Sequence, residues 1–341
     1  MLLKQNKHIL VIRLSAMGDV AMTVPVLRAL TQQYQEVKIT VLTRAFFKPF
    51  FRNIKNVSVF TADLKGEHKG VSGLYKLAHQ LNKNQQFYVI ADLHSVLRST
   101  ILKQFLNTKR FVSIDKGRAE KKALVNGKLF EPLKTTHQRY ADVFLSLGHK
   151  IDLSNPEFPE KVILSEKIIS ILGKDSKKRI GIAPFAAHEG KMYPLYLMEM
   201  VIENLSKDYQ ILLFGGGKYE AEILSQLETD FKNTVNLAGK LALDEELDII
   251  SNLDVMLSMD SGNAHLAAMF GVKVITIWGV THPFAGFAPF NQPEHYALLA
   301  DRNKYPKIPT SVYGNKYPEN YKEAAGSITP ETVVQKIKSI L

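Results

Sequence analysis

The stretch IRLSAMGDVAMTVPVLRAL, Ile12–Leu30, predicts the turn from a first buried strand into a first helix. The run that overlaps it, HILVIRL (8–14), is rich in Ile, Leu and Val, as strands buried on both faces are. Gly18 offers the backbone freedom that a tight turn needs. The helix is expected over 20–34, with Pro25 in its early turns, where proline does least harm.

The same alternation of short apolar runs and helix-like segments continues along the chain. Further strands are expected at 37–43, 57–60, 88–93, 179–185, 209–216, 234–239, 254–259 and 272–279, and helices at about 194–206, 218–230, 243–252 and 262–270. Strand–helix alternation predicts an α/β fold with parallel sheets. The two series predict two doubly wound, Rossmann-like domains with a ligand cleft between them.

A stretch of different composition separates the two series. Residues 152–179 contain two prolines, a polar cluster and one helical segment, which is typical of a linker. We therefore expect an N-terminal domain at 1–155, a linker at 156–178, a C-terminal domain at 179–327 and a last helical segment at 328–341.

Composition narrows the class of protein. The chain of 341 residues is 45% hydrophobic and 23% charged, as soluble globular proteins are. It has no cysteine, which excludes disulfides and thiolate–metal sites. The N-terminal residues lack the apolar run of a secretory signal, and no stretch is apolar enough for a membrane span. We expect a cytoplasmic protein.

The net charge of +11 is unevenly distributed. Residues 1–150 carry 25 Lys and Arg against 9 Asp and Glu, a balance of +16, whereas residues 151–341 carry 19 against 24, a balance of −5. Such asymmetry indicates an anionic partner for the first half. Nucleic acid, an anionic membrane surface and a phosphorylated glycan all qualify, and so do solvated lysines that only aid solubility.

The turn at 15–19 contains an unexpected carboxylate. Ser15 and the free amides of the following helix suit an anion, yet Asp19 brings a negative charge to the same place. One reading is structural, with Asp19 capping the helix. The other is chemical, with the carboxylate as a reactive group. The stretch lacks the GxGxxG spacing of a dinucleotide-binding loop.

A second loop, MDSGNAHLAAMFG (259–271), follows another expected strand. Asp260 ends the strand, Ser261 and Gly262 turn the chain, and His265 lies in the first turn of the helix. Free amides at a helix start favour a diphosphate, Asp260 suits ribose hydroxyls or amides, and His265 suits a phosphate. The alternative is a capped helix with a buried histidine.

Two further loops carry weaker signals. Lys191, in APFAAHEGKMYP (183–194), is placed to offset negative charge on a leaving phosphate, unless it is a solvated surface lysine. Glu220 follows the glycines of FGGGKYEAE (214–222), where it either approaches a ligand or complements the helix dipole. No catalytic triad, HExxH pair or P-loop is present, and we expect no metal.

These four loops, in this order, resemble those of glycosyltransferase family 9, the heptosyltransferase-like enzymes of lipopolysaccharide core assembly. ILVIRLSAMGDVAMTVPVLRAL (9–30) is similar to the opening of the family, and DSGNAHLAAMFGVKVITIWGVTHP (260–283) to its nucleotide-binding signature. The likeness extends from residue 8 to the terminal SITPETVVQKIKSIL. It implies a GT-B architecture, with the acceptor on the N-terminal domain, the nucleotide sugar mainly on the C-terminal one, and a last helix, about 329–340, that folds back toward the first domain.

The resemblance also implies roles for individual residues. Transfer would be metal-independent and would invert the sugar's configuration, with Asp19 as the general base and Lys191 stabilising the departing diphosphate. The implied nucleotide contacts are Glu220, Asp260, Ser261, Gly262 and His265. Ser15 and Gly18, from the turn after the first strand, and His188 are further candidates for contacting the nucleotide sugar.

The chain departs from the family pattern in two places. Ala186 and Ala187 stand where hydroxyl residues are common, and His188 is a candidate replacement for the contact they would make. The cysteines that many members have before the last helix are absent here.

An ADP-linked sugar is the implied donor, a phosphorylated lipopolysaccharide core the implied acceptor, and no cofactor is expected. The basic first half would bind the acceptor and touch the anionic inner surface of the cytoplasmic membrane, with Arg98, Lys103, Lys121 and Lys122 as representative cations. The alternatives are a UDP- or GDP-sugar donor for another surface glycan, a non-catalytic nucleotide-sugar-binding relative, or a nucleic-acid-binding protein. For the last, the basic segment 93–129 offers few stacking aromatics, only Phe105 and Phe111.

Overall fold

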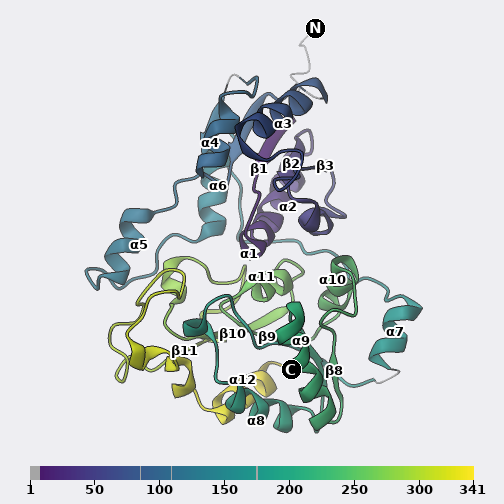
Figure 1. Ribbon diagram of the computed structural model, residues 1–341, viewed down its shortest axis with the longest axis vertical. Helices are drawn as coiled ribbons and strands as arrows, with labels where there is room; N and C mark the ends of the chain where they lie inside the picture. Colours follow the sequence, from purple (N-terminus) through teal and green to yellow (C-terminus); the bar gives the residue numbers. More distant parts are fainter. Residues whose placement is uncertain (1–7, 85, 109, 174–175) are drawn as a thin grey trace. The chain divides into compact units, whose positions relative to one another are not determined.

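The structure, a computed structural model, describes residues 8–84, 86–108, 110–173 and 176–341. Residues 1–7, on which the expectation about a secretory signal rests in part, lie outside this range, as do one residue of the basic segment and two of the expected linker. The chain divides into two compact units (Figure 1). Unit 1 consists of Met1–Lys116 with Thr136–Glu157, and unit 2 of Gly117–Thr135 with Phe158–Leu341.

Unit 1 is built on a parallel sheet with the strand order β3-β2-β1-β4-β5. Its strands are β1 (His8–Ile12), β2 (Lys38–Thr43), β3 (Val57–Thr61), β4 (Val89–Asp92) and β5 (Phe111–Ser113). β1 and β4, the central strands, are buried along their whole length because helices cover both faces of the sheet. This order is that of a Rossmann sheet and confirms the expected doubly wound architecture.

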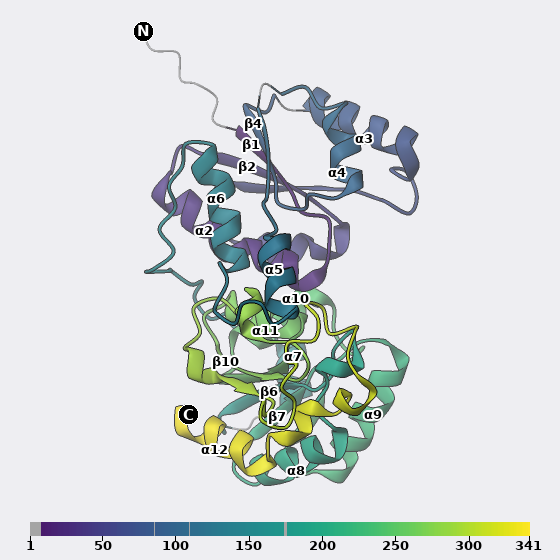
Figure 2. The ribbon, with the colours of Figure 1, turned by 90° about the vertical axis from the view of Figure 1, so that its left-hand side faces the viewer.

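Helices pack on the two faces of this sheet (Figure 2). They are α1 (Met17–Ala21), α2 (Thr23–Gln33), α3 (Gly70–Asn84), α4 (Leu97–Lys103) and α6 (Thr136–Ser146). Leu74 and Leu77 of α3 and Leu102 of α4 join the strands' Leu10 and Ile90 in one apolar core. α2 and α6 contact each other on the opposite face.

Unit 2 contains a longer parallel sheet with the order β11-β10-β9-β6-β7-β8. Its strands are β6 (Arg179–Ala183), β7 (Gln210–Leu213), β8 (Thr234–Asn236), β9 (Val255–Met259), β10 (Lys273–Trp278) and β11 (Ala297–Leu299). Its helices are α5 (Arg118–Val125), α7 (Glu166–Leu172), α8 (Leu195–Leu205), α9 (Gly217–Asp230), α10 (Leu243–Ser251), α11 (Gly262–Ala268) and α12 (Pro330–Ile340).

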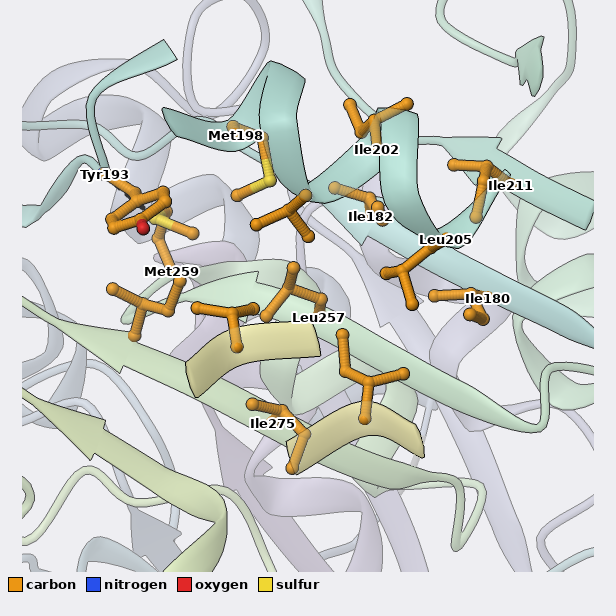
Figure 3. Close-up of a cluster of buried hydrophobic side chains, with 14 of the residues drawn as sticks. Ile180, Ile182, Tyr193, Met198, Ile202, Leu205, Ile211, Leu257, Met259 and Ile275 are labelled. Carbon is orange, nitrogen blue, oxygen red and sulfur yellow. Dashed lines mark hydrogen bonds between the residues drawn. The ribbon is translucent and has the colours of Figure 1, made fainter. Parts of the chain in front are cut away.

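The core of unit 2 lies between its sheet and α8 (Figure 3). Met198, Ile202 and Leu205 of α8 point at Ile182 of β6 and Leu257 of β9, and all five side chains are fully buried. α12 packs on α8 and contributes its own buried apolar face to this core. The last helix, which the sequence predicts at 329–340, therefore belongs to unit 2.

The first helix differs from its prediction. Instead of one helix over 20–34, α1 and α2 are separated at Met22. Pro25 lacks the N–H that a continuous helix would use to bond the carbonyl of Ala21, so it fits only in the first turn of a new helix. The three-residue strands β5 and β11 were not predicted, because such short runs carry no period.

Residues 117–135 also differ from the expected division of the chain. The sequence places them in the N-terminal domain, whereas they group with unit 2. Leu124 and Leu133 pack there against Ala285, and the amide of Leu133 donates to the carbonyl of Phe284 at 2.9 Å. Within the described ranges, no helix is both long and apolar enough to cross a membrane.

Truncation of Ile202 tests the core of unit 2. The Ile202→Ala variant should lose about 2–4 kcal/mol of unfolding free energy, because a fully buried side chain leaves a cavity. Tyr196→Ala, at a 60% exposed position of the same helix, should stay within about 0.5 kcal/mol of the parent. Denaturant unfolding followed by fluorescence of the single, buried tryptophan, Trp278, reports on this unit. Equal losses in the two variants would contradict the packing.

Candidate functional site

The polarity of each sheet determines where loop residues gather. In a parallel sheet all carboxyl ends share one edge, and ligands bind where the direction of strand order reverses. That point lies between β1 and β4 in unit 1, and between β6 and β9 in unit 2. Asp19 follows β1, Lys191 follows β6 and Asp260 follows β9, so the strongest sequence candidates all lie at these points.

In unit 1 the carboxylate of Asp19 is held by a buried arginine. Nη2 of Arg13 lies 2.6 Å from Oδ2 of Asp19, and Nη1 of Arg13 donates to the carbonyl of Leu93 at 2.7 Å. The Arg13 side chain is 8% exposed, whereas that of Asp19 is 28% exposed. The exposure of the Asp19 carboxylate leaves it within reach of a substrate.

Asp19 also has a structural role in α1. Ala16 is the residue before the helix, and its amide donates to Oδ2 of Asp19 at 3.3 Å. Asp19 thus satisfies one free amide from the third position of the helix and is not itself the N-cap. On the other side, the Tyr140 hydroxyl donates to the main-chain carbonyl of Asp19 at 3.2 Å. Burial raises the pKa of Tyr140, which keeps this hydroxyl protonated.

The loop after β4 is organised by a buried aspartate. Oδ1 of Asp92 accepts from the amides of His94 and Ser95, and Oδ2 accepts from the hydroxyls of Ser99 and Ser113. These bonds hold His94 so that its Nε2 lies 3.4 Å from Oγ of Ser15. A ligand beside Asp19 would therefore lie near a fixed imidazole.

His94 is neutral near pH 7. Burial, reinforced by the positive charges of Arg13 and Lys116, lowers the pKa of His94 to about 4. Its ring is 7% exposed, and no described residue partners its Nδ1. The group can therefore exchange hydrogen bonds but carries no charge at the site.

In unit 2 the structure brings Lys191 and Asp260 together. Nζ of Lys191 lies 2.8 Å from Oδ2 of Asp260, and Oγ1 of Thr281 donates to the same oxygen at 2.9 Å. The Lys191 side chain is 16% exposed and that of Asp260 7% exposed. Lys191 is thus a largely buried, paired cation at the strand edge rather than a solvated surface lysine.

The stem of Lys191 is packed by a glycine. Gly314 has a φ of +78°, and a Cβ there would lie 2.6 Å from Cγ of Lys191 and 3.1 Å from its Cδ. A Cβ on the neighbouring Gly190 would meet the ring of Tyr317 at 2.7 Å. The loop around 310–317 therefore closes on the Lys191 segment at two points where only glycine fits.

The other predicted nucleotide contacts of unit 2 come after the strands β6, β7 and β9 along the chain. Ser261 precedes α11 and its hydroxyl lies 3.0 Å from that of Ser258, Gly262 opens the helix, and His265 is buried within it. Glu220 accepts from the amide of Gly216 at 2.7 Å, so it caps its own helix. His188 is exposed and directly precedes the short 3₁₀ helix η2 (Glu189–Lys191).

A pocket of about 540 Å³ lies at the carboxyl edge of the sheet in unit 1. Ser15, Arg44 and Arg98 are among its lining residues. Arg44 is anchored by donating from Nε to the carbonyl of Leu14 at 3.0 Å. Lys103, from the same helix as Arg98, lies over the ring of Phe111 at 4.9 Å, outside the pocket.

The four predicted acceptor-binding cations divide between the two units. Arg98 and Lys103 belong to α4 of unit 1, whereas Lys121 and Lys122 belong to α5 of unit 2. Nζ of Lys121 lies 4.1 Å from the ring centre of Phe287, and Lys122 is exposed.

Arg13, His94 and Thr281 were not predicted from the sequence as members of the site. Arg13 carried the clearest signal, since a charge inside an apolar strand needs a buried partner. In the part of the chain that the structure describes, no group of three or more His, Asp or Glu side chains is arranged to hold a metal ion.

Sequence comparison places these loops among known proteins. The model of glycosyltransferase family 9 (heptosyltransferase) matches residues 74–316. The chain is 26% identical over 308 residues to the lipopolysaccharide core heptosyltransferase OpsX of Haemophilus influenzae, covering 87% of this chain and 86% of that protein. It is 25% identical over 354 residues to lipopolysaccharide heptosyltransferase 2 of Salmonella typhimurium, covering 98% of both.

Solved structures share the fold. The family 9 glycosyltransferase of Veillonella parvula superposes with a TM-score of 0.78 at 18% identity, covering 98% of this chain and 97% of that one. ADP-heptose lipopolysaccharide heptosyltransferase II of E. coli gives a TM-score of 0.68 at 19% identity, covering 98% of both. The two parallel-sheet units thus form a GT-B fold. By its match over most of its length, the chain belongs to glycosyltransferase family 9, the heptosyltransferase family, and is a glycosyltransferase.

Proposed function

We propose that this enzyme transfers a heptose or similar sugar from an ADP-linked donor to a lipopolysaccharide core acceptor, with inversion. The observation that carries the proposal is Asp19, a partly exposed carboxylate paired with buried Arg13 at the switch point of a Rossmann sheet. The relatives named as lipopolysaccharide core heptosyltransferases support the reaction class. A solved neighbour, E. coli WaaC with ADP-2-deoxy-2-fluoro heptose, supports the donor.

The chemistry is one displacement at the anomeric carbon. An acceptor hydroxyl attacks, its oxygen forms the new glycosidic bond, and the bond from the sugar to the diphosphate oxygen breaks with its electron pair leaving on the nucleotide. Asp19 takes the proton of the attacking hydroxyl. Lys191 stabilises the negative charge that develops on the departing diphosphate.

Arg13 and Asp260 prepare these two groups. The contact with Arg13 fixes the direction of the Asp19 carboxylate, so this group needs no rearrangement before it accepts a proton. Asp260, steadied by Thr281, holds Lys191 before the donor arrives. Fixed charges of this kind act without reorganisation at the moment of reaction.

The remaining predicted residues are assigned to binding of the donor and the acceptor. Ser261, Gly262, His265 and Glu220 surround the donor nucleotide, with Ser15, Gly18 and His188 near its phosphates or sugar. The basic residues Arg98, Lys103, Lys121 and Lys122 attract a phosphorylated acceptor and the inner, anionic face of the cytoplasmic membrane. Ala186 and Ala187 keep a UDP- or GDP-sugar donor as the second candidate.

The function is tested by nucleoside-diphosphate release. The enzyme is incubated with ADP-, UDP- and GDP-linked sugars, each with and without a deacylated core oligosaccharide. We expect release from the ADP-linked heptose only, and only when the acceptor is present. Release from a UDP- or GDP-sugar would change the donor, and no acceptor-dependent release from any donor would refute the reaction.

Replacement of Asp19 tests the base. Asp19→Asn keeps the size of the side chain but removes proton acceptance, so kcat should fall by about 10²–10⁴-fold. The dissociation constant for the donor nucleotide should change by less than about twofold, because the residues proposed to surround the nucleotide, Ser261, Gly262, His265 and Glu220, lie in unit 2. Steady-state kinetics and calorimetric titration measure the two quantities. Undiminished turnover would make Asp19 a purely structural residue.

Replacement of Gly314 tests the positioning of Lys191. Gly314→Ala should lower kcat by about 10²-fold, because a Cβ there pushes on the lysine stem. Gly173→Ala is the matched control, with a φ of +77° but no neighbouring atom within 4 Å. In a Lys191→Ala background, Gly314→Ala should have no further effect. If the losses of kcat from the two substitutions were additive, Gly314 would not act through Lys191.

A further inference from the structure

We propose that a groove of unit 2, separate from the Lys191–Asp260 pair, binds an anionic saccharide whose sugars carry phosphate or carboxylate groups. The inference rests on the proposed function in one respect, since it takes this saccharide to be part of the acceptor. The groove is formed by the end of α5 with the turn that follows it, and by the segment after β11.

The groove encloses about 610 Å³. Leu124–Gly127 and Phe130 form one wall, and Arg302, Pro306–Ile308, Thr310 and Lys316–Pro318 form the other. Volumes of this order suit small ligands. Leu124 and Leu133 pack against Ala285, which holds the first wall on the rest of unit 2.

The charge of the groove is positive. Its lining includes Arg302, Lys307 and Lys316, and no Asp or Glu occurs from 302 to 318. This contrasts with the acidic balance of residues 151–341. Among the described residues, Lys307 and Lys316 have no acidic partner. A cluster of unpaired cations around one hollow attracts a ligand with several negative charges.

One cation is fixed in place. The guanidinium of Arg302 stacks on the ring of Phe130 at 3.5 Å from its centre, and Nε donates to the carbonyl of Ile308 at 3.0 Å. An arginine held in this way presents its remaining N–H groups in a planar fork that matches phosphate and carboxylate oxygens.

Apolar surfaces complete the lining and favour a sugar over a bare anion. Phe130 is 41% exposed, and Tyr317, Pro306 and Pro318 add further carbon surface. The negative face of an aromatic ring attracts the positive edges of C–H groups, which pyranose rings present. The combination of cations with aromatic and proline surface therefore fits an acidic saccharide.

The groove shares a wall with the proposed reaction centre. The segment 310–317 that lines it also packs on the Lys191 stem through Gly314 and beside Gly190 through Tyr317. The amide of Thr310 donates to the carbonyl of Val280, at the end of β10. A saccharide in the groove would thus lie on the same edge of the sheet as Lys191.

The test measures binding without a donor. The probe is a deacylated lipopolysaccharide core oligosaccharide, titrated calorimetrically before and after removal of its phosphates. The double variant Lys307→Ala/Lys316→Ala should weaken binding of the phosphorylated probe at least tenfold. Lys304→Ala, an exposed lysine of the same segment outside the lining, should change it less than twofold.

The two probes separate the sources of charge. If dephosphorylation weakens binding to the wild type as much as the double variant does, phosphate is the group recognised. If the wild type still binds the dephosphorylated probe and the double variant does not, carboxylate is the group recognised. Equal affinity of wild type and double variant, or no binding by the wild type, would overturn the inference.

The result is independent of catalysis. Oligosaccharide binding through the groove with no sugar transfer would refute the proposed function and leave the groove assigned. Acceptor-dependent transfer, with unchanged oligosaccharide binding in the double variant, would support the proposed function and refute the assignment of the groove.

Discussion

The polarity of two parallel sheets is the constraint on which this structure depends. Each sheet brings the carboxyl ends of its strands to one edge, and each reverses its strand order next to the first strand of the unit. Arg13, Asp19 and His94 follow the two strands at this point in unit 1, and Lys191 and Asp260 follow those in unit 2. Within each unit, residues far apart in the sequence therefore lie close together because of the strand order alone.

Each unit has one ion pair at the point where its strand order reverses, and the two members of each pair differ in exposure. In unit 1 the arginine is the buried member and the carboxylate is the accessible one, which suits proton acceptance. In unit 2 the carboxylate is the more buried member and the lysine the more accessible one, which suits an anionic leaving group. The sign of the accessible charge thus differs between the units, which agrees with the proposed roles of a base and of a group that stabilises the leaving diphosphate.

The sequence predicts the fold well and the site in part. Apolar runs such as HILVIRL determine the strands because both faces of a parallel sheet are buried, and Asp19, Lys191 and Asp260 could be named from their places after strands. The contact between Lys191 and Asp260 could not, since 69 positions separate them and only strand order joins them. Residues 117–135 were misplaced for a related reason: their few apolar side chains do not say which unit they pack on.

The central claim is that the sugar is transferred in a single displacement, with Asp19 of unit 1 as the base and Lys191 of unit 2 stabilising the leaving diphosphate. The measurement that tests it most directly is the anomeric configuration of the transferred sugar, compared in donor and product through the one-bond carbon–hydrogen coupling at the anomeric carbon by NMR. We predict opposite configurations in donor and product, because in a single displacement the acceptor attacks from the side opposite the leaving diphosphate. Retention of configuration would contradict it, since two displacements would then be needed and Asp19 would not act as the base of a single one.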